Sequence, residues 1–129
     1  MNNLFTFFNN LFRSVLHAVQ GFRVLIREEV NGRIHLVITA AALILACILH
    51  LTTIEWIIVV LLIGFVFALE LMNTAIEHLA NFVAPERNEK IKKIKDLAAA
   101  GVLIGAIAAG IIGLIIFIPK LIQFIKLYA

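Results

Sequence analysis

ELMNTAIE, residues 70–77, is the stretch around which this chain is organised. It closes an apolar run, residues 56–76, whose only formal charge is Glu70. A run of about 20 apolar residues is long enough to cross a bilayer as a helix. A carboxylate inside such a run is costly to bury in lipid, so Glu70 indicates a functional site.

Two further polar residues, Asn73 and Glu77, follow Glu70 at helical spacing. At about 100° per residue the three side chains fall on one helix face, within roughly 60° of each other. A polar seam that holds helices together is the alternative, and it would account for a lone Asn73. It accounts poorly for two carboxylates that repel one another when ionised. Because a bound cation would remove that repulsion, we favour a functional face.

The composition predicts an all-α integral membrane protein of one domain, residues 1–129, because 63% of the residues are hydrophobic. Soluble domains are nearer half apolar. The single Cys47 allows no intrachain disulfide. The chain lacks a basic stripe with interleaved aromatic residues, so we expect no nucleic-acid partner.

Three transmembrane helices are expected, over residues 34–54, 56–80 and 97–119. Residues 2–27 place apolar side chains at helical spacing among Asn and Arg, a pattern typical of a helix in the membrane interface. Packing of that helix onto its own bundle stays open as an alternative. The polar stretch over residues 84–96 is expected to be a loop.

Two glycine patterns refine this expectation. Gly32 predicts a break or bend before the first transmembrane helix. Small residues also repeat at every fourth position of the last one, which predicts close helix packing within or between subunits. The repeating residues are Gly101, Gly105, Ala109 and Gly113.

The distribution of Lys and Arg predicts the orientation. They occur before the first expected helix and over residues 84–96, but none lies between the first two helices. The positive-inside rule therefore puts the N-terminus and residues 84–96 in the cytoplasm, and the C-terminus outside. This orientation brings Glu29, Glu70, Glu77 and Lys95 near the cytoplasmic face.

Carboxylates and a lysine at one membrane face indicate chemistry with a divalent metal and a phosphate. Glu29 and Glu77 are oxygen ligands of the kind that Mg²⁺ prefers, and Lys95 is a cationic partner for phosphate. Glu70, the deepest carboxylate, is the natural base for the hydroxyl of a lipid at the interface. The chain has no glycine-rich phosphate loop, so a kinase would need another design.

Four segments carry a family resemblance. ELMNTAIE and KDLAAAGVL, residues 95–103, resemble the signature of the prokaryotic diacylglycerol kinase and undecaprenol kinase family. RSVLHAVQGF, residues 13–22, is similar to the entry segment of that family, and EVNGRIH, residues 29–35, to its segment before the first transmembrane helix. Of the neighbouring acids Glu28 and Glu29, the register of the last segment favours Glu29.

The resemblance implies a homotrimer of three-span subunits, each with an N-terminal surface helix. It implies active sites shared between subunits at the cytoplasmic side of the bacterial plasma membrane, with ATP as co-substrate and Mg²⁺ as cofactor. It also implies a role for each matching residue: Glu70 as proton acceptor; Glu29 and Glu77 as metal ligands; Lys95, Asp96 and His17 as nucleotide contacts, with Arg13 one turn before His17; and Asn73 as a polar group lining the site.

Three positions depart from the family pattern. Gly32 stands where members often carry an aromatic residue, Asn81 where many have Asp, and Ala99 where some diacylglycerol-specific members have Ser. Diacylglycerol and undecaprenol both present one primary hydroxyl and long apolar tails, so the sequence leaves the choice of lipid open.

Three functions are compatible with a small membrane protein of this kind: an ATP-dependent lipid kinase, a non-enzymatic scaffold or pore-forming subunit, and a phosphatase. A scaffold has no need of a carboxylate face combined with Lys95 and Asp96. The full set of kinase positions also argues against a phosphatase. The sequence therefore favours the lipid kinase.

Overall fold

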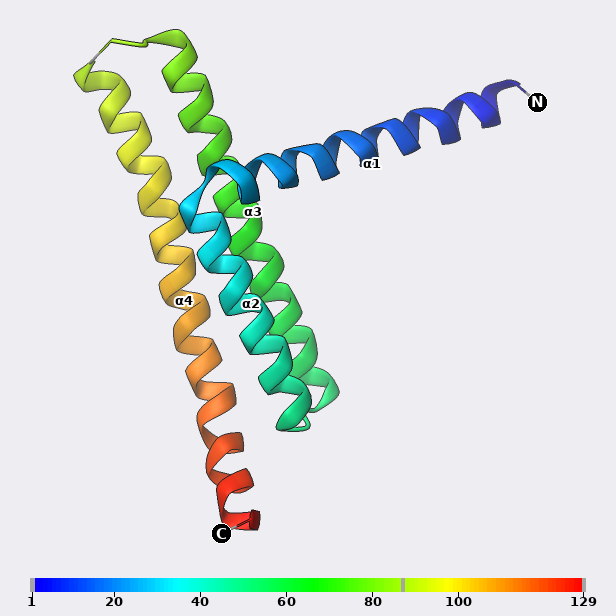
Figure 1. Cartoon of the computed structure of the whole chain (residues 1–129), viewed down its shortest axis with the longest axis vertical. Coiled ribbons are helices and arrows are strands. Elements are labelled where there is room, and N and C mark those ends of the chain that lie inside the picture. The colour runs from blue at the N-terminus through cyan, green and yellow to red at the C-terminus, as the bar shows by residue number, and fades with distance from the viewer. Residues whose placement is uncertain (1, 87, 129) are drawn as a thin grey trace.

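The computed structural model describes residues 2–86 and 88–128, and every regular element in these ranges is a helix. The helices are α1 (Asn2–Glu28), α2 (Val30–Ile48), α3 (Thr53–Val83) and α4 (Glu89–Tyr128) (Figure 1). Three of them, α2, α3 and α4, are long and apolar enough to cross a membrane. The expected all-α membrane fold is confirmed. The ends of the expected domain, Met1 and Ala129, lie outside the described residues.

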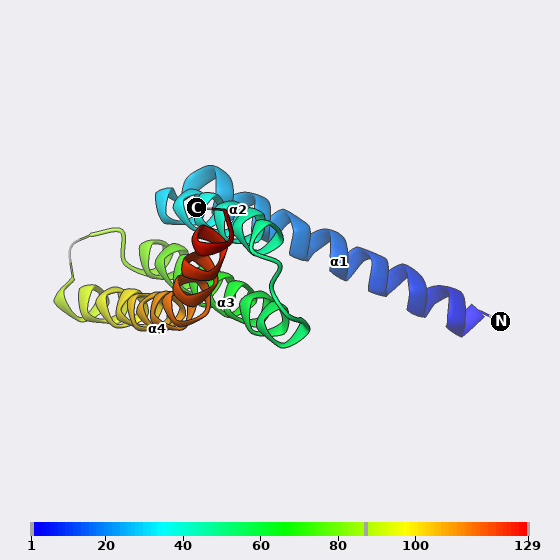
Figure 2. The same cartoon turned by 90° about the horizontal axis from the view of Figure 1, so that it is seen from below.

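Helices α2, α3 and α4 run alongside one another, whereas α1 leaves the bundle at a steep angle (Figures 1 and 2). Only the C-terminal end of α1 is held by the bundle: the Phe22 ring lies 5.3 Å from the Phe67 ring, centroid to centroid, and Leu25 is fully buried. The remainder of α1 exposes apolar side chains such as Phe8 and Leu11. A helix with this distribution is suited to the membrane interface.

The chain turns from α1 into α2 at Glu29, so the predicted break at Gly32 is wrong by three residues. Glu29 has extended backbone angles, φ −101° and ψ 128°. Gly32 lies inside α2, where an added Cβ would come 2.8 Å from Leu25 Cγ and 2.9 Å from the Leu25 carbonyl oxygen. Gly32 therefore permits the close approach of α1 to α2, and an aromatic side chain would not fit there.

The end of α2 also differs from expectation. The first transmembrane helix was expected to reach residue 54, but α2 ends at Ile48 because Leu49 and Leu51 turn inward to pack against Ala46 and Val59. Thr52 then begins α3 with a capping box: its backbone N–H donates to Glu55 Oε2 at 2.6 Å, and its hydroxyl accepts from the Glu55 N–H at 3.4 Å.

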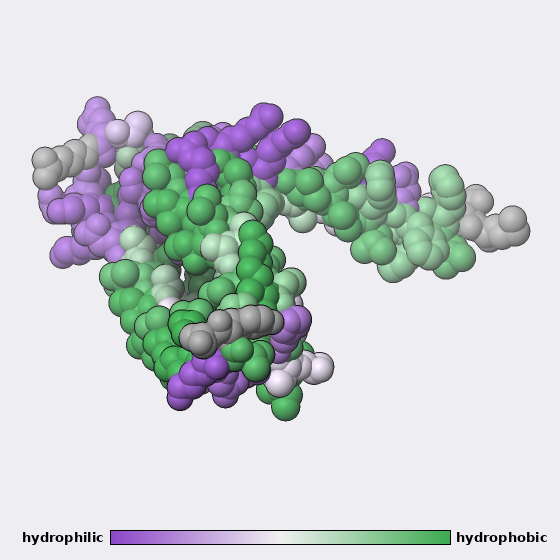
Figure 3. Space-filling view, turned by 60° about the horizontal axis from the view of Figure 1, so that its bottom comes forward, coloured by the Kyte–Doolittle hydropathy of each residue, from purple (hydrophilic) through white to green (hydrophobic). Residues whose placement is uncertain are grey.

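At the opposite end of the bundle, the expected loop over residues 84–96 is mostly helical. The connection spans residues 84–88, and α4 begins at Glu89. Asn88 Oδ1 accepts hydrogen bonds from the backbone N–H groups of Lys90, at 2.9 Å, and Ile91, at 3.4 Å, as an N-cap does. The polar composition of this stretch belongs to a helix that projects beyond the apolar zone. Figure 3 shows this pattern on the face of the bundle in view, with polar side chains at its two ends and apolar ones between.

Among the three glycines of the α4 stripe, Gly105 is the one that packs closely against another helix of the chain. A Cβ added at Gly105 would collide with Leu69 Cδ1 and come 3.3 Å from Phe65 Cε1, both on α3. Gly101 and Gly113 have open space around them. Within the chain, the expected close packing therefore holds at Gly105, against α3, and packing of the stripe between subunits stays a prediction.

Gly105→Leu is expected to destabilise the fold by about 1–3 kcal/mol, because overpacking forces α3 and α4 apart. Gly101→Leu, one turn earlier on the same helix, is the matched control, since its side chain meets open space. The thermal midpoint of each variant in mild detergent gives the comparison. Equal midpoints for the two variants would contradict the close α3–α4 contact.

Candidate active site

One face of α3 carries three buried polar side chains whose hydrogen-bonding capacity is not met. Glu70 is 1% exposed, and Asn73 and Thr74 are also buried. Glu70 Oε2, Asn73 Oδ1 and Thr74 Oγ1 have no hydrogen-bond partner among the described residues. Buried polar atoms are nearly always hydrogen-bonded, since leaving one unpaired costs about 1–3 kcal/mol. Three such atoms within one helical turn indicate a site completed by something other than this chain's own described side chains.

The carboxylates that the sequence grouped together are close to one another in the fold. Asn73 Nδ2 donates a hydrogen bond of 3.3 Å to Glu77 Oε1 and so fixes the orientation of that carboxylate. Glu29 and Glu77 lie near enough to Glu70 for their charges to act on it. The junction at Glu29 thus lies beside the polar face of α3. An uncompensated group of three carboxylates is unfavourable, which again favours a bound cation.

The neighbouring acids Glu28 and Glu29 have different surroundings. Glu28 Oε2 lies 3.7 Å from Nε2 of His78, and both side chains are about half exposed. Glu29 is the acid whose charge acts on Glu70. This arrangement is consistent with the choice of Glu29 over Glu28 as the site residue.

Lys95 approaches the site from α4. Its Nζ donates a hydrogen bond of 3.2 Å to Asn81 Oδ1, which ties α4 to α3. Asn81 follows Glu77 by one helical turn, so this contact holds the lysine near the carboxylate face. Asn81 stands at a position where many members of the similar family have Asp. Because Asn81 is neutral, it orients Lys95 without neutralising the charge of the lysine. Asp96, the next residue, is exposed.

The N-terminal part of α1, which contains Arg13 and His17, extends away from the bundle (Figure 1). Both side chains are exposed, and His17 Nδ1 lies 3.4 Å from Oε1 of its neighbour Gln20. The single chain therefore does not bring these two residues to Glu70. Their predicted contact with nucleotide would need a second subunit, as an active site shared between subunits implies.

Comparison with known proteins identifies the relatives of this chain. Residues 16–117 match the family model described as prokaryotic diacylglycerol kinase. The chain belongs to that family. It is 42% identical to undecaprenol kinase of Bacillus subtilis, over 88% of this chain and 92% of that protein. It is 35% identical to a diacylglycerol kinase of Synechocystis, over 88% of this chain and 66% of that protein. Identity to a diacylglycerol kinase of Escherichia coli is 28%, over 84% and 89% of the two chains.

As a member of this family, the chain is a lipid kinase with ATP as co-substrate. Family membership and the three apolar helices together make it a bacterial membrane protein. The alternatives of a scaffold, a pore-forming subunit and a phosphatase are set aside. The resemblance read from the four sequence segments is confirmed.

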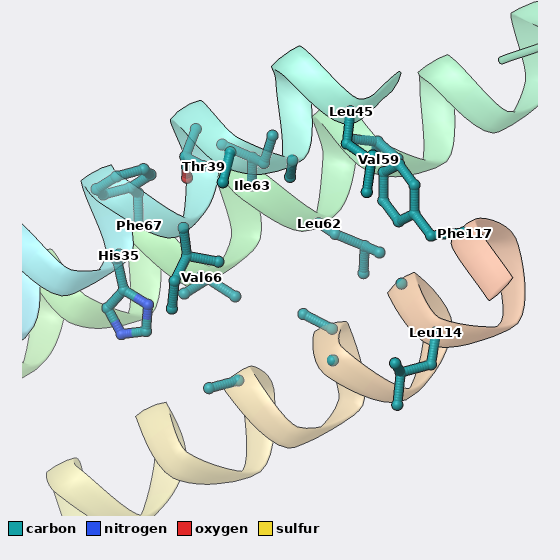
Figure 4. Close-up of a pocket in the computed structure, with 17 residues that line it drawn as sticks. His35, Thr39, Leu45, Val59, Leu62, Ile63, Val66, Phe67, Leu114 and Phe117 are labelled. Carbon is teal, nitrogen blue, oxygen red and sulfur yellow. The ribbon is translucent and has the colours of Figure 1, made fainter. Parts of the chain in front are cut away.

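Two side chains near the candidate site were not predicted from the sequence. Thr74 follows Glu70 by four residues, so helical spacing alone already placed it on the polar face. His35, on α2, lies in the lining of one apolar cleft together with Val66 and Phe67 of α3 (Figure 4). Sequence spacing relates residues within a helix only, so it gave no signal that His35 on α2 faces α3.

The oxygen-rich donor set fits a magnesium ion that arrives with a nucleotide. Among residues 2–86 and 88–128, no group of three or more His, Cys, Asp or Glu side chains is arranged to hold a metal by itself. Mg²⁺ usually takes one or two protein carboxylates and completes its shell with water and substrate phosphates. The pair Glu29 and Glu77, together with unpaired oxygen atoms on the same face, meets that requirement.

Proposed function

We propose that this kinase transfers the terminal phosphate of ATP to the primary hydroxyl of a membrane lipid alcohol at the cytoplasmic interface. The observation that carries the proposal is the buried, unpaired carboxylate oxygen of Glu70, with the unpaired oxygens of Asn73 and Thr74 beside it. A carboxylate at this depth is reached by the polar end of a lipid. Nucleotide, in contrast, approaches from the aqueous end, where Lys95 lies.

In this proposal Glu70 is the general base. Its carboxylate takes the proton of the lipid hydroxyl as the oxygen forms its bond to the phosphorus, and ADP departs. The burial of Glu70 keeps water from competing as the acceptor. Lys95 holds the phosphates by its charge, and Asp96, His17 and Arg13 contact the nucleotide. The last two reach the site from a neighbouring subunit in a homotrimer.

Glu29 and Glu77 would hold Mg²⁺ in this site, and Asn73 would keep the Glu77 carboxylate in position through its hydrogen bond. When bound, the ion neutralises the charge of the transferring phosphate. The different roles of the three acids follow from their burial. Glu70 is fully buried, whereas Glu29 and Glu77 are half buried and nearer the aqueous end.

We propose undecaprenol, rather than diacylglycerol, as the preferred lipid. The relative named undecaprenol kinase has the higher identity of the three compared here, and Ala99 departs from the Ser of some diacylglycerol-specific members.

The proposed function is tested by ATP consumption of the purified protein in detergent micelles that contain undecaprenol, diacylglycerol or neither. We expect consumption to require Mg²⁺ and an added lipid alcohol, and to be faster with undecaprenol. Consumption that is independent of lipid would contradict a lipid kinase function, and faster turnover with diacylglycerol would reverse the substrate preference.

A reporter fused after the C-terminus is expected to be active outside the cytoplasm, and one inserted between Glu86 and Asn88 inside it. The excess of Lys and Arg on the loop side of the bundle is the reason. Paired alkaline phosphatase and fluorescent-protein fusions at both positions make the measurement. Reporters active on the same side would contradict a crossing by α4 between these two points.

A further inference from the structure

Helix α1 meets the bundle at a joint formed by its last two turns (Figure 1). On one side of the joint Leu25 is fully buried against Gly32 of α2. On the other side the Phe22 ring packs on Phe67 of α3. A single residue with extended backbone angles, Glu29, connects α1 to α2, so the connection has no slack. The joint therefore sets the direction in which α1 leaves the bundle.

The closest contact of this joint is between Leu25 and Gly32. A Cβ added at Gly32 would come 2.8 Å from Leu25 Cγ and 2.9 Å from the Leu25 carbonyl oxygen. Rotation of the Leu25 side chain does not relieve the second contact, because the oxygen belongs to the backbone and accepts a 3.1 Å hydrogen bond from the Glu29 N–H. Atoms in ordinary contact are about 3.5–4.0 Å apart. A side chain at position 32 therefore displaces α1 itself, by about 1 Å at Leu25.

The length of α1 amplifies such a displacement. With a rise of about 1.5 Å per residue, Leu25 lies about 6 Å from the turn at Glu29 and Arg13 lies about 24 Å from it. If α1 turns as a rigid body about this point, a shift of about 1 Å at Leu25 becomes about 4 Å at Arg13 and about 3 Å at His17. Hydrogen bonds span about 2.7–3.2 Å between heavy atoms, so displacements of this size break them.

We propose that Gly32 is a positioning residue for nucleotide binding, which directs α1 so that Arg13 and His17 reach the nucleotide. This inference rests on the proposed function, in which these two side chains contact nucleotide in a neighbouring subunit. Because the rest of α1 leaves the bundle, the joint determines where both side chains lie relative to it. The absence of a side chain at Gly32 thus acts on a site that Gly32 itself does not touch.

The direction of α1 is measured with two spin labels in Gly32→Ala. One label is attached to Cys47, the single cysteine of the chain, which is exposed on α2, and the other to the exposed position of Asn9→Cys on α1. An excess of unlabelled protein keeps the labelled subunits apart. We expect the angle between α1 and α2 to open and the distance between the labels to lengthen by about 3 Å. Gly64→Ala on α3 is the matched control, because an added Cβ there meets nothing within 4 Å.

Nucleotide binding is measured on the same variants without lipid. The dissociation constant for Mg²⁺–ATP is expected to rise by about 10-fold or more in Gly32→Ala, the loss of one hydrogen bond to a charged group. Gly64→Ala should keep the parent value. In turnover, the KM for lipid should also stay at the parent value in Gly32→Ala, whereas general damage to the fold would change both constants.

A double-mutant cycle shows whether Gly32 acts through α1. In the background Arg13→Gln/His17→Gln, Gly32→Ala should raise the dissociation constant for Mg²⁺–ATP no further, since the contacts that it displaces are already absent. Residues that act through one another give such non-additive effects. Two effects that multiply would mean that Gly32 acts by another route, such as a displaced Glu29, and would overturn the proposal.

Phe22→Ala tests the same joint from the α3 side and replaces Gly32→Ala if that variant does not fold. It removes the ring contact with Phe67 without introducing a collision. Its label distances should spread over a wider range, and its affinity for Mg²⁺–ATP should fall. Parent-like distances and affinity in this variant would contradict control of nucleotide binding by the joint.

The outcomes separate this inference from the proposed function. If the parent phosphorylates no lipid, yet Gly32→Ala lengthens the label distance and weakens Mg²⁺–ATP binding without adding to the α1 variants, the proposed function fails and the positioning role stands. If the parent phosphorylates lipid but Gly32→Ala leaves the label distance unchanged, the positioning role is overturned. A lengthened distance with parent-like nucleotide affinity overturns it as well.

Discussion

Glu70→Gln is expected to lower the rate of lipid phosphorylation by about 10²–10⁴-fold, the usual contribution of general-base catalysis. Glutamine is nearly isosteric and still forms hydrogen bonds, but it does not accept the proton of a lipid hydroxyl. The affinity for Mg²⁺–ATP should change much less, because Glu29 and Glu77 remain. This combination distinguishes a base from a metal ligand and from a structural contact.

Single-turnover phosphorylation at saturating ATP, with nucleotide affinity measured on the same preparation, provides the test. Glu55→Gln is the matched control at the other end of α3. Glutamine there can still complete the capping box with Thr52, while the ion pair to Lys120, 3.1 Å between Nζ and Oε2, is lost. That variant should keep the parent rate. A parent-like rate in Glu70→Gln would refute the base assignment, and equal losses of rate and affinity would make Glu70 a metal ligand.

Glu77→Gln and Glu29→Gln are expected to weaken Mg²⁺–ATP binding by about 10²-fold, since even the loss of a group that only orients a metal ligand costs 10–100-fold. Each change removes an anionic oxygen of the kind that Mg²⁺ prefers. Turnover falls with the affinity, and raised Mg²⁺ should restore part of both. ATP affinity titrated over a range of Mg²⁺ concentrations makes the measurement.

Glu28→Gln is the control for the Glu29 variant, because Glu28 is the adjacent acid and its carboxylate lies beside His78. Its ATP affinity should stay within a few fold of the parent value. Parent-like Mg²⁺–ATP affinity in both Glu29→Gln and Glu77→Gln would remove these residues from the metal site. A large loss in Glu28→Gln would reverse the choice between the two neighbouring acids.

Periodicity within one helix was sufficient to find the polar face of α3. Glu70, Asn73 and Glu77 share a face because their spacing fixes their angles around the helix axis, whatever packs against it. The same spacing rule places Thr74 on this polar face. The three apolar helices were likewise predictable from the sequence, because the thickness of the bilayer sets their length and composition.

Contacts between helices could not be predicted from the spacing of residues within one helix. Gly32 was interpreted as a break, yet its role is to let Leu25 of α1 approach α2, a contact that depends on the turn at Glu29. Residues 84–96 were expected to be a loop because they are polar, but a solvated helix is polar as well. Arg13 and His17 are placed on a helix that leaves the bundle, so their proposed role depends on a neighbouring subunit.

Direct transfer of the terminal phosphate to lipid tests the central claim most directly. The purified protein is given ATP labelled at that phosphate, Mg²⁺ and undecaprenol, and the label is followed in the lipid and aqueous phases. The account predicts that the label enters the lipid, with one ADP formed for each phosphorylated lipid. Label released only as inorganic phosphate, at a rate that does not depend on the lipid, would contradict it.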